Sequence, residues 1–214
     1  MQNLKLINKA QPPAKIEIKH SIFYAFLIPA SELKQTLLNL RQEHTKAVHF
    51  VWASREINKY SQIVENQSDD GEPKGSSGAP SLNALRGASL INSAVVIVRY
   101  FGGIKLGVGG LVRAYSSAVN LAIDEAKTAG AIAEYTQKSE CIFYTPFSLL
   151  ARFEHYFLAK GEPLPEREFI EQGAVWQASF SEGEFGEFFT FAKGFSFSGL
   201  KWLGLPIYAK IYDF

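Results

Sequence analysis

Glycine is the residue whose distribution most constrains how this chain can fold. Residues 1–68 contain no glycine, whereas residues 69–113 contain nine of the seventeen. Most of these nine lie in two loops, 69–80 and 102–110, on either side of the apolar run Ala94–Val98. Five consecutive apolar residues indicate a central strand that is buried on both faces. Because glycine adopts torsions that other residues avoid, the two loops are expected to be tight connections flanking that strand.

Hydrophobic spacing predicts the remaining elements of the first half. Apolar residues occupy even positions from Ile16 to Ile28, broken only at His20, and this period of two predicts one long strand. A second strand is expected at 48–52. Helices are expected after Ser31, from Pro80, and after Gly110. The last of these carries an apolar stripe made of Leu111, Tyr115, Ala118 and Ala122.

Charge and phenylalanine content divide the chain into two predicted domains, 1–132 and 133–214. Residues 1–133 carry 15 Lys and Arg against 10 Asp and Glu, whereas residues 134–214 carry 7 against 11. The second part also holds 13 of the 17 phenylalanines. Its pattern predicts strand 139–145, helix 147–160, strands 167–171 and 174–180, helix 182–193 and strand 205–212. That βαββαβ order is the ferredoxin-like arrangement, so the fold class is α+β.

Several protein classes are disfavoured by composition. The single cysteine, Cys141, rules out an internal disulfide framework and a cysteine zinc cluster, and we interpret it as a buried small hydrophobe. The sequence contains no run of about 18 apolar residues, which a membrane span would need, and we read no signal-peptide pattern at the N-terminus. A cytoplasmic protein is therefore expected. The excess of positive charge before residue 134 is compatible with a phosphate-bearing partner.

The loop at 102–110 predicts an anion site. A strand, a glycine loop and a helix together present free backbone N–H groups at the positive end of the helix dipole. We predict that phosphate or nucleic acid binds residues of both loops: Lys74, Ser76, Ser77, Arg99, Gly102, Gly103, Lys105, Gly109, Gly110 and Arg113. The alternative is structural, with the glycines allowing close packing and the cations solvated. Neither the Walker motif nor the complete dinucleotide fingerprint is present.

The loop at 69–80 contains three carboxylates in four residues, Asp69, Asp70 and Glu72. They could ligate Mg²⁺ beside a substrate phosphate, or supply a general base. Equally, they could cap a turn or pair with Arg99 or Lys105. No nucleophile motif accompanies them, so no catalytic residue is predicted and a binding module is favoured over an enzyme.

Two long segments, Ser68–Pro80 and Val98–Tyr115, together resemble the signature of the YigZ/IMPACT family, and the resemblance covers roughly residues 15–130. The segment Ala47–Ala53 departs from the family's more usual A-T-H-N-C-Y-A pattern. We interpret His49, within it, as a core or edge residue of a strand.

This resemblance implies a ribosomal-protein-S5-domain-2-like first domain, with a mixed sheet and helices on one side, and a ferredoxin-like second domain. It also implies regulation of translation, because IMPACT relatives bind the activator of an initiation-factor kinase and bacterial members are suspected RNA or ribosome binders. We therefore expect a partner that is RNA, the ribosome or a translation-associated protein. The alternatives are a protein-interaction module with structural loops and a Mg²⁺-dependent enzyme acting on a phosphorylated small molecule or nucleotide.

Overall fold

The computed structural model describes residues 4–58, 60–161, 163–207 and 209–211. The chain divides into unit 1, residues 1–135, and unit 2, residues 136–214, so the boundary lies three residues beyond the predicted one. Among the described residues, no helix combines the length and apolarity that crossing a membrane requires.

Unit 1 is built on a five-stranded sheet with the order β2-β3-β6-β4-β5. Its strands are β2 (Ala14–Ile18), β3 (Ser21–Pro29), β4 (His49–Ile57), β5 (Ile63–Ser68) and β6 (Ser93–Tyr100). The predicted central strand is confirmed, because β6 is the middle strand and Ala94–Val98 are fully buried. All four pairings are antiparallel, so the expected mixed sheet is wrong for this unit.

The single long strand predicted from Ile16 to Ile28 is also wrong, because the chain reverses at Lys19 and His20. Both residues have positive φ, 47° and 62°, and the pair Ile18–Ser21 closes a two-residue hairpin between β2 and β3. Positive φ at both central positions is the geometry that Asn-Gly or Asp-Gly usually supplies. Lys-His gives no such signal, so period-two spacing alone could not locate the turn.

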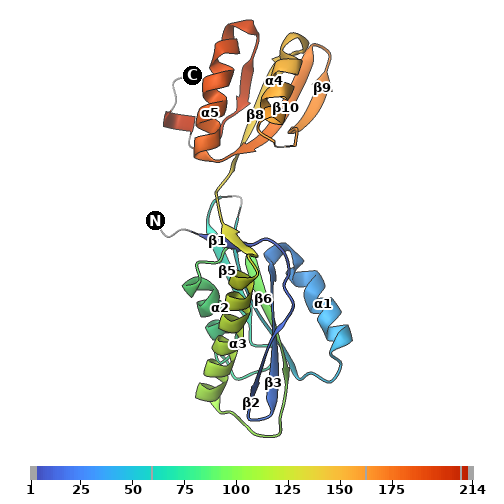
Figure 1. The fold of residues 1–214 in the computed structure, drawn as a ribbon, viewed down its shortest axis with the longest axis vertical. Coiled ribbons are helices and arrows are strands. Elements are labelled where there is room, and N and C mark those ends of the chain that lie inside the picture. The colour runs from blue at the N-terminus through green and yellow to red at the C-terminus, as the bar shows by residue number, and fades with distance from the viewer. Residues whose placement is uncertain (1–3, 59, 162, 208, 212–214) are drawn as a thin grey trace. The chain divides into compact units, whose positions relative to one another are not determined.

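Helices cover both faces of this sheet, whereas helices on one side were expected (Figure 1). Helix α1 (Leu33–Glu43), preceded by the 3₁₀ turn η1 (Ala30–Glu32), packs on the face formed by even-numbered residues of β3 and β6. Helices α2 (Gly78–Gly87) and α3 (Val108–Thr128) pack on the opposite face. The predicted stripe of α3 lies entirely in that second core. Helices are needed on both faces of the sheet because β3 and β6 carry hydrophobic side chains on both sides.

A short two-stranded sheet that was not predicted joins the two ends of unit 1. Strand β1 (Lys5–Ile7) pairs antiparallel with β7 (Ile132–Glu134). Backbone hydrogen bonds from Lys5 N to Ser89 O, at 2.9 Å, and from Ile91 N to Lys5 O, at 2.7 Å, attach β1 to the segment before β6. Three-residue strands are too short to show a period.

Unit 2 has the predicted element order β-α-β-β-α-β and an antiparallel sheet with the order β11-β8-β10-β9. Its elements are β8 (Ser139–Pro146), α4 (Phe147–Ala159), β9 (Glu166–Ile170), β10 (Gly173–Phe180), α5 (Glu182–Ala192), β11 (Lys201–Gly204) and the 3₁₀ turns η2 (Lys193–Ser198) and η3 (Ala209–Ile211). The last strand lies earlier than the predicted 205–212, of which residues 208 and 212 are outside the described residues. Pro206 lies two residues after the end of β11 and has no N–H to continue the ladder.

Aromatic side chains form most of the core of unit 2, as its composition predicted. Trp176 is fully buried, stacks on Phe143 with ring centroids 5.8 Å apart, and donates from its indole nitrogen to Thr145 Oγ1 at 2.9 Å. Cys141 is buried in the same core, as predicted, and burial raises the pKa of its thiol to about 12. Such a thiol stays protonated and unreactive at neutral pH.

Candidate functional site

The two glycine-rich loops meet in unit 1, and a cavity of about 320 Å³ lies between them. Residues of the first loop, of the second loop and of the start of α3 all contribute to its wall. The polar lining is His49, Glu72, Arg99 and Lys105, and the apolar lining includes Pro73, Phe101, Leu106, Val108 and Leu111. The sequence left open whether the loops converge. The first loop follows β5 and the second follows β6, and since both strands run antiparallel to β4, their C-terminal ends lie at the same end of the sheet.

A depression of about 370 Å³ also lies on the sheet of unit 2 opposite its helices, lined by Tyr144, Ile170, Glu171, Gln172, Val175, Lys201 and Leu203. Its charged groups, Glu171 and Lys201, are exposed to solvent. The cavity of unit 1 differs because charged groups are buried in its wall. Burying charge is costly and is typical of functional sites, so the unit 1 cavity is the candidate site.

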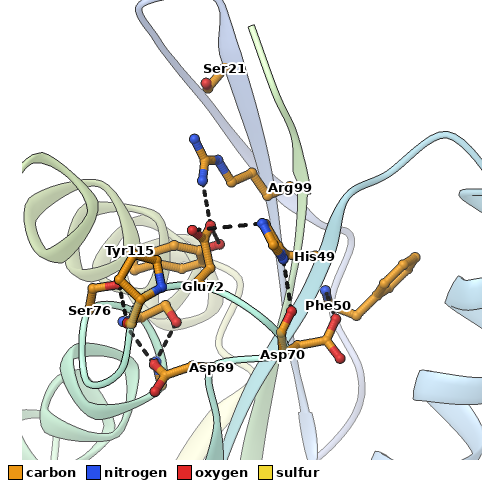
Figure 2. Close-up of polar contacts among 12 residues, drawn as sticks. Ser21, His49, Phe50, Asp69, Asp70, Glu72, Ser76, Arg99 and Tyr115 are labelled. Atoms are coloured by element: carbon orange, nitrogen blue, oxygen red, sulfur yellow. Dashed lines mark hydrogen bonds and ion pairs between the residues drawn. The ribbon is translucent and has the colours of Figure 1, made fainter. Parts of the chain in front are cut away.

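Glu72 is the centre of that buried charge (Figure 2). Its Oε1 accepts hydrogen bonds from Arg99 Nη1 at 2.5 Å and from the Tyr115 hydroxyl at 2.6 Å. The three residues come from the first loop, the end of β6 and the second turn of α3, and each is at least nine-tenths buried. Burial, followed by the bond to Glu72, raises the pKa of Tyr115 above its ordinary value. The phenol therefore stays protonated and acts as a donor.

Arg99 has an unsatisfied donor within this cluster. Its Nε is the one buried side-chain nitrogen or oxygen, among the described residues, that has no hydrogen-bond partner. The guanidinium carbon lies 5.5 Å from the ring centroid of Phe23 and 5.8 Å from that of Phe101. Aromatic faces stabilise the cation but cannot accept its N–H in place of an oxygen.

The neighbours of His49 define which of its ring nitrogens carries hydrogen. Its Nδ1 lies 2.8 Å from the carbonyl oxygen of Asp70, which can only accept, so Nδ1 carries hydrogen. Its Nε2 lies 3.8 Å from Glu72 Oε2. The strand register explains the location, because His49 of β4 is paired with Arg99 of β6. His49 is the first residue of β4, an inner strand of the sheet, and its ring lines the cavity, whereas the sequence was interpreted as placing it in the core or at an edge.

Asp69 organises the first loop instead of binding a ligand. Its carboxylate accepts from the backbone N–H groups of Gly75, Ser77 and Gly78 at 2.8 to 3.1 Å and from the Ser77 hydroxyl at 2.7 Å. Partial burial raises the pKa of Asp69, but these hydrogen bonds together lower it by more than burial raises it, so the pKa lies below its ordinary value. Ser76 is also buried, and its hydroxyl donates to Pro73 O. Neither serine hydroxyl is placed to contact a phosphate.

Asp70 also has a structural role, because its carboxylate accepts hydrogen bonds from Arg41 Nη2 and from the backbone N–H of Phe50, both at 2.6 Å. The three acidic residues thus have three separate sets of partners. No group of three or more His, Cys, Asp or Glu in the described part of the chain is arranged to hold a metal ion. The hypothesis that Asp69, Asp70 and Glu72 bind Mg²⁺ together therefore has no support from this geometry.

The predicted cations differ in their relation to the cavity. Lys105 lines it, whereas Lys74 and Arg113 are exposed nearby in sequence but do not line it. None of the three forms an ion pair with a described residue, and Arg99 is the only predicted cation that is buried. Positive charge is thus available at the cavity and on the surface beside it.

The glycines of the second loop have distinct reasons to be glycine. A Cβ on Gly102 would lie 2.1 Å from the carbonyl carbon of His20, so this position requires the bare backbone to pass the β2–β3 turn. Gly103 and Gly107 have φ of 83° and 72°. Gly109 and Gly110 lie in the first turn of α3, which begins directly after Gly107 and has no side-chain cap. The first N–H groups of α3 therefore lie at the cavity, where Gly107 and Val108 contribute to the wall.

Among the polar and aromatic residues of the site, His49, Phe101 and Tyr115 were not predicted as site residues. Tyr115 was assigned to the core from its stripe, and the stripe carries no information about its hydroxyl. For His49, the sequence held one signal that depends on the strand order. His49 begins one predicted strand and Arg99 ends another, and the two residues become neighbours once these strands are known to pair.

Comparison with known proteins gives matches over most of unit 1. The model of the Impact N-terminal domain matches residues 19–123. An "IMPACT family member" of Haemophilus influenzae is 40% identical over 121 residues, which cover 55% of this chain and 59% of the relative. A Thermus thermophilus "IMPACT family member in pol 5'region" is 34% identical over 157 residues, covering 73% of this chain and 82% of the relative.

The matched part of this chain spans between 49% and 63% of the length of three curated relatives, those of H. influenzae, Bacillus subtilis and Escherichia coli. A solved structure described as "Crystal structure of an hypothetical protein" matches nearly the whole fold. It covers 97% of this chain and 99% of its own, with a TM-score of 0.72 and 26% sequence identity.

Proposed function

Because this chain belongs to the IMPACT family, we propose that it is a cytoplasmic regulator of translation that binds RNA at the cavity between its two glycine-rich loops. The role in translation follows the family resemblance. The strand order of unit 2 supports a ferredoxin-like assignment. The S5-domain-2-like assignment of unit 1 is a proposal from the resemblance, and its helices on both faces are a departure from it.

The observation that carries the proposal is the buried Arg99 side chain in the wall of a cavity that Lys105 and the start of α3 also line. The start of α3 adds backbone N–H groups and the positive end of a helix dipole at the same wall. Lys105 adds a full positive charge. Glu72 and Arg99 neutralise each other, so the net charge at the cavity comes from Lys105 and the start of α3 and favours an anion.

Salt-dependent RNA binding tests the proposal. A fluorescently labelled single-stranded RNA of eight nucleotides is titrated with the full chain at several salt concentrations. Each phosphate contact should contribute about −0.7 to the slope of log K against log salt concentration. Lys105→Ala should weaken binding and reduce the magnitude of the slope by about that amount. Lys34→Ala removes an exposed lysine of α1, on the opposite face of the sheet, and should leave both unchanged.

Two results would contradict the proposal: no RNA binding at low salt, or an unchanged slope for Lys105→Ala. Capture of a translation-associated protein that persists after nuclease treatment, together with either result, would favour the alternative of a protein-interaction module.

A further inference from the structure

One corner of the cavity presents two hydrogen-bond acceptors to each other. When the His49 ring carries only the Nδ1 proton that points toward Asp70 O, its Nε2 is an acceptor, and it lies 3.8 Å from the carboxylate oxygen Glu72 Oε2. That oxygen accepts no hydrogen bond from the described residues, since Arg99 and Tyr115 both donate to Oε1. Two acceptors at this separation require a donor that lies between them or beside both.

A neutral hydroxyl suits this corner better than an ammonium group. The charge of Glu72 is already balanced by Arg99, at 2.5 Å, and Lys105 lines the same cavity. Because Arg99 and Glu72 neutralise each other, a further cation there would face the net positive charge of Lys105, whereas a hydroxyl adds a donor without adding charge. A ligand hydroxyl would therefore donate to His49 Nε2 or to Glu72 Oε2.

The rest of the cavity supplies the complementary chemistry. Arg99, Lys105 and the start of α3 line the cavity and supply its positive charge and its donors. Phe101 lines the same cavity and is 47% exposed, so a flat ring can stack on it. The cavity thus combines a place for a hydroxyl, a place for an anion and an aromatic surface within about 320 Å³, which is near the lower limit of about 300 Å³ for small-ligand pockets.

We propose that this cavity holds one ribonucleotide unit, with its phosphate at Arg99 and Lys105, its ribose 2′-hydroxyl between His49 and Glu72, and its base against Phe101. The inference rests on the proposed function and adds to it the discrimination of RNA from DNA, which depends on recognition of that hydroxyl. The unit belongs either to an RNA chain or to a free nucleotide, because the three chemical groups are the same.

The test compares oligomers that differ only at the 2′ position. Labelled octamers of uridine, 2′-deoxyuridine and 2′-O-methyluridine are titrated with the full chain under one salt condition. A hydrogen bond to a charged group is worth enough to give about tenfold tighter binding of the ribo-oligomer. The 2′-O-methyl oligomer should bind no better than the deoxy one, because its oxygen cannot donate.

Variants assign the discrimination to its residues. His49→Asn can keep a donor to Asp70 O while removing the acceptor at Nε2, so it should lose most of the tenfold preference for the ribo-oligomer. His49→Ala removes both contacts and provides a second variant. His155→Ala, an exposed histidine of unit 2, should keep the full preference.

The outcomes separate the inference from the proposed function. Equal binding of ribo- and deoxy-oligomers by the wild type would overturn the inference and leave the proposed function intact. Retention of the preference by both His49 variants would overturn the assignment to this cavity. Binding of neither oligomer would overturn the proposed function. Uridine 5′-monophosphate and its 2′-deoxy form are titrated in parallel as competitors of the labelled oligomer. If they displace it with the same preference for the 2′-hydroxyl, the unit in the cavity is a free nucleotide.

Discussion

Replacing Asp69 tests whether its carboxylate holds the first loop in the conformation that forms the cavity. In Asp69→Ala, the N–H groups of Ser77 and Gly78 lose their acceptor, and both residues are buried. Each buried unpaired donor costs about 1–3 kcal/mol, whereas the exposed N–H of Gly75 can bind water. The free energy of unfolding of unit 1 should therefore fall by about 3 kcal/mol.

Asp69→Asn is the matched control. Three of the four hydrogen bonds end on one oxygen, Oδ1, which the amide can replace, and the fourth ends on Oδ2 at the exposed Gly75. The loss should be only about 1 kcal/mol. The pKa of Asp69 is lowered by folding, so its contribution is present above its ordinary value of 3.8 and is lost as the pH falls below that value. Asp69→Asn should lack this part of the acid dependence.

Hydrogen exchange of the β6 amides in the full chain measures these changes, because the central strand exchanges when unit 1 unfolds as a whole. A loss of about 3 kcal/mol corresponds to exchange more than about 100-fold faster, since about 1.4 kcal/mol is a factor of ten. If Asp69→Ala accelerates exchange less than about fivefold, or no more than Asp69→Asn does, the loop is not held by these hydrogen bonds.

Three further changes have expected results. Tyr115→Phe removes a buried donor to a carboxylate and should lower the urea-unfolding free energy by about 1.5–3 kcal/mol, so an unchanged value would contradict the role given to that hydroxyl. Gly102→Ala forces the β2–β3 turn to move and should lower the thermal-unfolding midpoint clearly, whereas Gly87→Ala, whose Cβ would meet nothing within 4 Å, should not. The hydrogen bond from Arg86, opposed by partial burial, lowers the pKa of Glu65 from 4.5 to about 2, so its stabilisation should be lost as pH falls from about 4.5 toward 2. Because Arg86 is half exposed, that loss should be about 1 kcal/mol and absent in Glu65→Gln when unfolding is measured between pH 2 and pH 6.

Local pattern was sufficient where one element buries a regular set of side chains. The run Ala94–Val98 predicted the middle strand, and the stripe of α3 predicted its buried face, because burial on both faces or on one face leaves a direct trace in sequence. The order of elements in unit 2 followed from the same reasoning. The turn at Lys19 and His20 left only the break in alternation at His20, because Lys-His is not one of the residue pairs typical of such a hairpin turn.

The site was harder to predict than the fold, since it depends on which segments become neighbours. Sequence spacing identified the two loops and the cations of one of them, but it could not assign different partners to Asp69, Asp70 and Glu72. Three adjacent carboxylates suggest a shared ion, yet the loop turns each toward a different part of unit 1. His49 was interpreted as packing because strand register, which sets it beside Arg99, is not encoded locally.

The pairing of β1 with β7 means that the polypeptide enters and leaves unit 1 at neighbouring points. A fragment cut to the matched range 19–123 would omit both strands and would leave the backbone of the segment before β6 without the partners that Lys5 provides. Conversely, a domain whose two ends adjoin can be circularly permuted, or spliced into an exposed loop of another protein, with only a short linker. Unit 1 cut outside β1 and β7 therefore suits use as an insertable module.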